Sequence, residues 1–295
     1  MDDYDLDVES VVRNDRDKDD HKLVGDSVLD EEWDVLIILD ACRYDSFKEN
    51  YKDFLVGSLN KKISVATRTA EWLRKTFTGK YDHIIYISGY PGVNSKNYKK
   101  ENGFNPNCFS KVVDVWDYGF DKALQTIHPM ELNKAFFKYK TLYPNKKFII
   151  HYMQPHSPYV GVDQKYRPTN RKPTPNEGKK SSNLNKRLRR LIYHNLMKTT
   201  RLPNSWIWRI SGILGIKSPL ARLYLDKGWK GFREAYKENL RFVLPYVKKV
   251  CENTKGKIVI TADHGERLGE KGMFGHGGSR DKVVVEVPWF EVINK

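Results

Sequence analysis

Short runs of aliphatic residues recur along the chain and predict the strands of a buried sheet. The clearest run is Val35–Leu39, where five consecutive aliphatic residues lie between two aspartates. A run of this length is too short for a helix, and its lack of alternation indicates that both faces of the strand are buried. Similar runs lie at residues 84–87, 112–115, 148–152, 257–261 and 283–287. We therefore expect a sheet with residues 35–39 as a central strand.

Between these runs, apolar residues recur every three or four positions, which predicts helices. Such patterns lie at about residues 69–77, 129–142 and 231–252. Strands that alternate with helices along a chain favour a largely parallel sheet. The pattern therefore predicts an α/β fold.

The segment from about 161 to 230 breaks this alternation. It begins with a loop rich in Pro, Asn and Lys, continues into a basic stretch, and ends in an aromatic and aliphatic patch at residues 206–216. We expect a basic helical insertion or cap on a main domain that spans residues 33–295. Residues 1–32 are rich in Asp and show little periodicity, which is typical of an acidic flexible arm.

Charge is distributed unevenly along the chain. The net charge is +15, yet residues 1–34 hold 14 acidic and 4 basic side chains, whereas residues 161–230 hold 17 Lys and Arg against 3 acids. A run of cations is usually a solvated surface. The aromatic residues Trp206 and Trp208 beside the cations also favour a peripheral contact with an anionic membrane through residues 185–216. Nucleic acid is less favoured, because the aromatic residues adjoin an aliphatic run and do not alternate with cations.

No run approaches the roughly 20 apolar residues that span a bilayer. The N-terminal residues also lack the basic start and apolar core of a secretory signal, so we expect a cytoplasmic location, with a membrane-peripheral one as the alternative. The three cysteines are far apart and show no CxxC spacing, which argues against a disulfide framework or a thiolate zinc site.

Polar residues follow three of the predicted strands at their carboxyl ends, where open α/β sheets gather their ligands. They are Asp40 and Arg43 after the first strand, His151 and His156 at the fourth, and Asp263, His264, Glu266 and His276 after the fifth. Carboxylates and imidazoles suit a divalent cation. Each residue alone also has a structural interpretation: Asp40 as a helix cap, Asp-His-Gly as a tight turn, and His156 as a loop histidine. Their coincidence at three strand ends favours a metal site.

Several motifs in order resemble one known family. The segments WDVLIILDACRYDSF, TRTAEWL, IIHYMQPHSPY, IVITADHGERLGE, FGHGG and VPWFEV are similar to archaeal sulfatase-like proteins of the alkaline phosphatase and sulfatase superfamily. The similarity covers residues 33–160 and 231–292 and leaves out 161–230. It implies a three-layer α/β/α alkaline phosphatase-like fold, and it makes the main domain a catalytic one.

The resemblance also implies roles for single residues. Asp40, Asp263 and His264 would bind a divalent metal ion, with the Thr69 hydroxyl completing the site. Thr69 would be the nucleophile at the start of a helix, with Thr67 as the alternative. His156 and His276 would bind the transferring group or protonate the leaving oxygen. Arg43 would be an anion contact or a partner of Asp45. His151 would be a further substrate-binding residue.

Two departures from the family narrow the expected chemistry. The Cys-x-Pro-Ser-Arg motif of sulfatases is absent, and Tyr152 stands where members with two metals have an Asp four residues before the His. We therefore expect one metal site, holding zinc, manganese, magnesium or calcium, and leave a second one open. The predicted activity is a metal-dependent phosphoester hydrolase or phosphoryl-substituent transferase that acts on an anionic ester of a glycan, lipid or small molecule. A sulfate-ester hydrolase and a catalytically inactive polyanion-binding protein are the alternatives.

Overall fold

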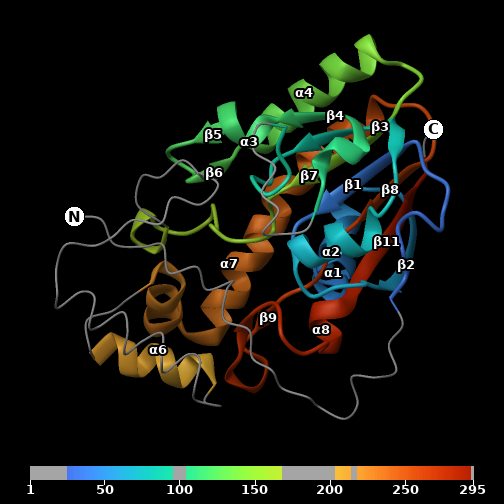
Figure 1. The fold of residues 1–295 in the computed structure, drawn as a ribbon. Helices are drawn as coiled ribbons and strands as arrows, with labels where there is room; N and C mark the ends of the chain where they lie inside the picture. The colour runs from blue at the N-terminus through green and yellow to red at the C-terminus, as the bar shows by residue number, and fades with distance from the viewer. Residues whose placement is uncertain (1–24, 96–103, 168–202, 214–217, 294–295) are drawn as a thin grey trace.

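The structure is built around a central sheet of seven strands. The computed structural model describes residues 25–95, 104–167, 203–213 and 218–293, and the sheet runs through the middle of them (Figure 1). In order across the sheet, the strands are β2 (Gly57–Ile63), β11 (Glu286–Val292), β8 (Ile258–Thr261), β1 (Val35–Leu39), β7 (Lys147–Tyr152), β3 (Tyr81–Ser88) and β4 (Phe109–Asp114). The strands β8, β1, β7, β3 and β4 are parallel, whereas β11 runs antiparallel to both of its neighbours. The largely parallel α/β sheet expected from the sequence is confirmed.

The central strand β1 is buried on both faces, as its continuous aliphatic sequence predicts. Val35, Ile37 and Leu39 face one hydrophobic cluster, and Leu36 and Ile38 face another. The first cluster lies under α1 (Tyr44–Asn50), α4 (Pro129–Leu142) and the second half of α7 (Pro219–Glu252). The second lies under α2 (Thr69–Thr76), together with Val28 and Trp33. The sheet is therefore the middle layer of an α/β/α arrangement.

One prediction of local structure is wrong, and one strand was not predicted. Residues 283–287 do not form one strand: Lys282–Val285 is the short helix α8, and strand β11 begins at Glu286. The valine run cannot show this boundary, because a short apolar run fits a buried helix as well as a strand. The edge strand β2 was not predicted, because its sequence GSLNKKI has few aliphatic residues and all of its residues are exposed or half-buried.

A third hydrophobic cluster lies beside the sheet, in and next to the predicted insertion. It joins α6 (Asn204–Ile213), the first half of α7 and the turn η6 (Gln164–Tyr166) to the hairpin of β9 (Arg267–Leu268) and β10 (Phe274–Gly275). We call α6, η6 and the first half of α7 the cap. Residues 168–202 and 214–217 of the predicted insertion, and 1–24 of the predicted arm, lie outside the described residues. Of the rest of that arm, Asp26 bonds to β2 through its backbone and Val28 is buried.

Shorter elements complete the structure. They are η3 (Tyr51–Asp53), η5 (Pro106–Cys108), α3 (Val115–Tyr118), β5 (Phe120–Asp121), β6 (Thr126–Ile127) and η7 (Glu270–Gly272). Helix α7 continues through Gly228, whose positive φ of 67° marks a sharp change of direction within it. Among the described residues, no helix has both the length and the apolar sequence needed to cross a bilayer.

Candidate active site

The polar residues predicted at the strand ends come together in the structure. Asp40 follows β1, His151 lies in β7, and Asp263 and His264 follow β8, and these three strands are neighbours in the sheet. All four side chains are almost completely buried. Because adjacent parallel strands end at the same edge, residues more than 200 positions apart share one site.

Asp263 is at the centre of this group. Its Oδ1 atom accepts the backbone amides of Ala41 at 3.1 Å and of His264 at 3.0 Å. Its Oδ2 atom has no hydrogen-bond donor among the described residues. Burial raises the pKa of Asp263, but His264, His151 and the Thr69 hydroxyl lower it by more than burial raises it. The pKa of Asp263 therefore lies below its usual value. The carboxylate is therefore ionised and has one oxygen available for a cation.

His264 presents one ring nitrogen to the same point. Its Nδ1 atom lies 2.9 Å from the carbonyl oxygen of Gly265, which can only accept a hydrogen bond. Nδ1 therefore carries the proton of the neutral ring, and Nε2 keeps its lone pair. That Nε2 atom is 3.3 Å from Asp263 Oδ2 and 3.9 Å from Asp40 Oδ1. A histidine held in this tautomer has the orientation of a metal ligand.

Thr69 is the first residue of α2, and its hydroxyl faces His264. The distance between Thr69 Oγ1 and His264 Nε2 is 3.3 Å, and the threonine is buried. The residue in the N-cap position is Arg68, so the Thr69 hydroxyl does not cap the helix. Thr67, the alternative nucleophile, accepts the amide of Gly277 through its carbonyl oxygen. Of the two threonines, Thr69 is therefore the one whose hydroxyl contacts the proposed metal ligands.

His151 belongs to the group as well. Its Nδ1 atom is 2.7 Å from the Tyr86 hydroxyl, while its Nε2 atom has no hydrogen-bond partner among the described residues. Burial lowers the pKa of His151 to about 4, so the ring is neutral. One ring nitrogen of His151 and carboxylate oxygens of Asp40 and Asp263 all lie within 4.8 Å of one another. The sequence suggested a substrate contact for His151, whereas its position also suits a metal ligand.

A second group of ligand atoms lies beside the first. Ligand atoms of His156, Glu266 and His276 are within 4.8 Å of one another, and the two histidine Nε2 atoms are 3.3 Å apart. His156 Nδ1 lies 2.7 Å from the Ser157 carbonyl, which again leaves Nε2 with its lone pair. The ring of His276 stacks on His264 at a centroid distance of 4.3 Å. The two groups of residues therefore form one continuous site.

The sequence groups Glu266 with the polar residues at the strand ends but assigns it no role of its own. It is buried, and its Oε2 atom has no hydrogen-bond partner among the described residues. A signal was present, because Glu266 ends the same Asp-His-Gly-Glu turn that supplies Asp263 and His264. Glu266 supplies a carboxylate to the second group. Tyr152, at the position where the resemblance implies an aspartate, instead donates its hydroxyl to Asn133.

The donor atoms fit a divalent cation. Buried carboxylate oxygens without a donor are costly unless a cation compensates their charge. Here Asp263 and Glu266 each have such an oxygen, and His151 has such a nitrogen. Carboxylate oxygen together with imidazole nitrogen is the ligand set of zinc and manganese sites, and all three cysteines are buried outside these groups.

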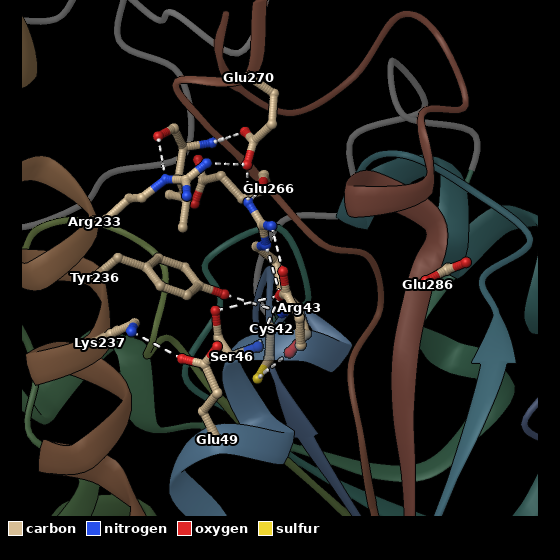
Figure 2. A network of polar contacts seen from close by, with 12 residues as sticks. Cys42, Arg43, Ser46, Glu49, Arg233, Tyr236, Lys237, Glu266, Glu270 and Glu286 are labelled. Carbon is tan, nitrogen blue, oxygen red and sulfur yellow. Dashed lines mark hydrogen bonds and ion pairs between the residues drawn. The ribbon is translucent and has the colours of Figure 1, made fainter. Parts of the chain in front are cut away.

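Arg43, a substrate-binding candidate from the sequence, forms ion pairs and hydrogen bonds with other residues of the protein (Figure 2). Its guanidinium contacts both carboxylate oxygens of Asp45 and lies 2.7 Å from Glu270 Oε1. It also donates to the backbone carbonyl of Glu266 at 3.2 Å. Arg233 of α7 binds the same oxygen of Glu270 at 2.7 Å. Arg43 therefore joins the turn after β1 to the loop that carries Glu266.

Comparison with known proteins identifies the fold. No family model matches the chain, and no curated protein matches it. The phosphonate monoester hydrolase of Agrobacterium radiobacter is similar in structure, with a TM-score of 0.51 and 14% identity over 87% of this chain and 67% of that one. The chain therefore has the alkaline phosphatase-like α/β fold.

Two transferases show weaker similarity. Lipooligosaccharide phosphoethanolamine transferase A of Neisseria meningitidis, an integral membrane protein, has a TM-score of 0.45 and 16% identity over 87% of this chain. The present chain spans about half of that protein, 47% of its length. The C-terminal periplasmic domain of phosphoethanolamine transferase EptC of Campylobacter jejuni has a TM-score of 0.42 and 14% identity over 87% of this chain and 77% of that one.

These comparisons correct two expectations. The cytoplasmic location expected from the N-terminal sequence is not supported, since the neighbours include an integral membrane protein and C-terminal periplasmic domains. The archaeal part of the resemblance also finds no support among them.

Proposed function

We propose that the protein is a metal-dependent phosphoester hydrolase or phosphoryl-substituent transferase with Thr69 as its nucleophile. The observation that supports this most strongly is the position of the Thr69 hydroxyl, 3.3 Å from His264 Nε2 and at the first residue of α2. There the hydroxyl faces buried carboxylates and imidazoles, while the free amides at the start of the helix favour an anion.

Asp40, Asp263, His264 and Thr69 would hold the metal ion, with His151 as a further ligand. A bound divalent ion would lower the pKa of the Thr69 hydroxyl and neutralise charge that develops on the phosphoryl oxygens. We propose a second cation or a substrate oxygen at His156, Glu266 and His276, whose ligand atoms converge without involving the first group.

We assign each residue a role in one in-line displacement at phosphorus. The Thr69 hydroxyl gives its proton to solvent, and Thr69 Oγ forms a bond to phosphorus while the bond from phosphorus to the leaving oxygen breaks. A proton carried by His156 or His276 then moves to that oxygen. The product is a phosphothreonine. Water or an acceptor alcohol would then attack its phosphorus, the bond from phosphorus to Thr69 Oγ would break, and the proton of the attacking group would return to Thr69. Arg43 would hold the Glu266 loop in place and would not contact the substrate, because its guanidinium is bound to Asp45 and Glu270.

We propose residues 33–295 as one catalytic domain, interrupted at about 161–230, with the cap as a surface that contacts anionic membranes. Of the aromatic residues in the predicted membrane segment, Trp206 is 61% exposed whereas Trp208 is buried inside the cap. Trp229, 51% exposed, is a second indole on the cap. Residues 185–202 and 214–216 of that segment lie outside the described residues.

The function is tested with matched variants of one helix. Thr69→Val removes the proposed nucleophile with little change of shape. Thr76→Val makes the same change at the other end of α2, where the buried hydroxyl has no hydrogen-bond partner among the described residues. We expect purified protein to contain a divalent metal and to hydrolyse chromogenic phosphate esters faster than sulfate esters. Thr69→Val should lose this turnover and Thr76→Val should keep it. Equal activity of the two variants would contradict the assignment.

A further inference from the structure

We propose that Arg68 is an anion-binding residue of the active site and that it selects dianionic phosphate monoesters over monoanionic diesters. This inference rests on the proposed function, because it deepens the chemistry of the same site. Sequence patterns gave Arg68 no role, and its place in the structure suggests one.

Arg68 lies between the two loops that carry the reacting groups. It directly precedes Thr69, in an extended conformation with φ −153° and ψ 147°. Its guanidinium lies against the backbone of Gly277, where an added Cβ would be 2.2 Å from Arg68 Nε and 2.7 Å from Nη2. Gly277 directly follows His276. The side chain of Arg68 therefore reaches from the nucleophile's turn to the loop that holds a candidate acid.

The backbone fixes this arrangement from both sides. The Gly277 amide donates to the Thr67 carbonyl at 2.9 Å, so the two loops are joined next to Arg68. The Gly277 carbonyl accepts from Arg267 Nη1 at 3.0 Å. Gly277 has a positive φ of 82°, a conformation that glycine adopts without strain. Gly277 therefore permits the tight turn and, because it has no Cβ, leaves room for the Arg68 guanidinium against its backbone.

The charge of Arg68 is not neutralised within the described residues. Other arginines around the site are bound: Arg43 by Asp45 and Glu270, Arg267 by Asp281, and Arg280 by the carbonyl oxygens of Ser64 and Val65. Across the described ranges, the Arg68 side chain makes no hydrogen bond and no ion pair. A half-buried guanidinium beside a catalytic turn, without a carboxylate, is a ready partner for a substrate anion.

Phosphoryl oxygens fit this cation well. Arginine binds two oxygens of one phosphate through parallel N–H groups, and such charge-assisted bonds are stronger than neutral ones. A monoester carries two negative charges on its non-bridging oxygens, and a diester carries one. A cation at this position therefore stabilises a bound monoester more than a bound diester, and inorganic phosphate should bind in the same way.

The test compares the two ester classes in matched variants. Arg68→Ala removes the cation, and Arg68→Lys keeps the charge but loses the paired donors. Arg74→Ala is the control, because Arg74 is an exposed cation on the same helix. The measurements are kcat/KM for p-nitrophenyl phosphate and for bis-p-nitrophenyl phosphate, together with the inhibition constant of inorganic phosphate and the metal content.

We expect Arg68→Ala to lower kcat/KM for the monoester by about 10- to 100-fold, the range of one charge-assisted hydrogen bond, and to lower that for the diester much less. The phosphate inhibition constant should rise in parallel, Arg68→Lys should recover part of the loss, and Arg74→Ala should match the wild type. Equal losses for both esters, or none for the monoester, would overturn the role of Arg68.

Failure of the proposed function looks different. In that case the wild type would turn over neither ester, and the binding of inorganic phosphate, measured by calorimetry, would decide the role of Arg68 alone. Phosphate affinity that falls in Arg68→Ala at unchanged metal content would support the anion contact. Affinity that is equal in Arg68→Ala and the wild type would refute it.

Discussion

The hydroxyl of Tyr236 donates a hydrogen bond to the carbonyl of Ala41 over 2.7 Å. It also accepts the amide of Arg43 over 3.0 Å (Figure 2). Ala41 directly follows Asp40 and has a positive φ of 57°, which is uncommon for a residue other than glycine. The Ala41 amide in turn donates to Asp263 Oδ1. A side chain of α7 therefore holds the turn that aligns Asp40 with Asp263.

The first prediction concerns the two hydrogen bonds of the Tyr236 hydroxyl to Ala41 and Arg43, which we call the Tyr236 clamp. Tyr236→Phe keeps the ring but leaves a buried carbonyl and a buried amide without a partner, at a cost of about 1–3 kcal/mol of unfolding free energy. Metal affinity should fall as well, because the Ala41 turn would be free to relax. Chemical denaturation and a metal-competition titration measure the two effects. Tyr224→Phe, which changes a half-buried cap tyrosine, is the control. Unchanged metal affinity in Tyr236→Phe would refute the clamp.

The centre of the site could be predicted from the sequence, and the reason is local. Asp40 and Asp263 each follow a continuous aliphatic strand, and the strand-end rule places such residues at one edge whatever the rest of the chain does. Thr69 could be located because it begins a short amphipathic helix. The strand pattern predicts that Asp40 and Asp263 lie at one edge of the sheet, whereas the roles of these residues and of Thr69 come from the resemblance to the sulfatase-like family.

The surroundings of the site could not be predicted, because they depend on contacts between distant segments. Glu266 joins a group with His276 only because the β9–β10 hairpin brings His276 back to it. Arg43 faces Glu270 and Arg233 only because α7 packs beside the turn after β1. Neither relationship has a spacing in the sequence from which it could be inferred.

The ion pairs of Glu270 predict a pH dependence of stability. Burial raises the pKa of Glu270, but the hydrogen bond and charge of Arg43 lower it more, so the folded-state pKa lies below the ordinary 4.5. Because the folded pKa is depressed, the stabilisation is present above pH 4.5 and is lost as the pH falls through the folded pKa.

Glu270→Gln should therefore unfold at lower denaturant than the wild type at pH 7, by about 1–3 kcal/mol for a lost charged hydrogen bond. The gap should close as the pH falls below 4.5. Glu49→Gln, which removes an exposed partner of Lys237, should change stability little at either pH. A gap that persists at the acidic end would show that the charge of Glu270 is not what stabilises the network.

Glu266 should determine how many metal ions the protein holds. Glu266→Gln replaces a buried carboxylate by an amide of nearly equal size, so the first group of ligands should remain intact. We expect elemental analysis to find one equivalent of metal fewer per chain than in the wild type. Glu286→Gln is the control, because Glu286 pairs with Lys61 on strand β2. If both variants keep the metal content of the wild type, His156 and His276 bind substrate and not a cation.

The two exposed indoles of the cap predict attachment to anionic bilayers. Trp206 lies on α6, whose neighbour Ser205 packs against Gly272, and Trp229 packs against Gly269, so both lie beside the turn η7. Lys230 and Arg233 lie near the Trp229 ring and Lys271 is at the turn itself, so cations surround the aromatic residues. Indoles and cations together are typical of a surface that enters the headgroup region of anionic lipid.

We expect the protein to sediment with vesicles of phosphatidylcholine and phosphatidylglycerol, but not with vesicles of phosphatidylcholine alone. The sedimented fraction should decrease as salt screens the attraction. Trp206→Ser with Trp229→Ser should weaken binding about 10-fold or more, the scale of a lost buried aromatic side chain. Tyr118→Ser changes an exposed aromatic residue outside the cap and should bind as the wild type does. Equal sedimentation of the double variant and the wild type would show that the cap indoles do not enter the bilayer.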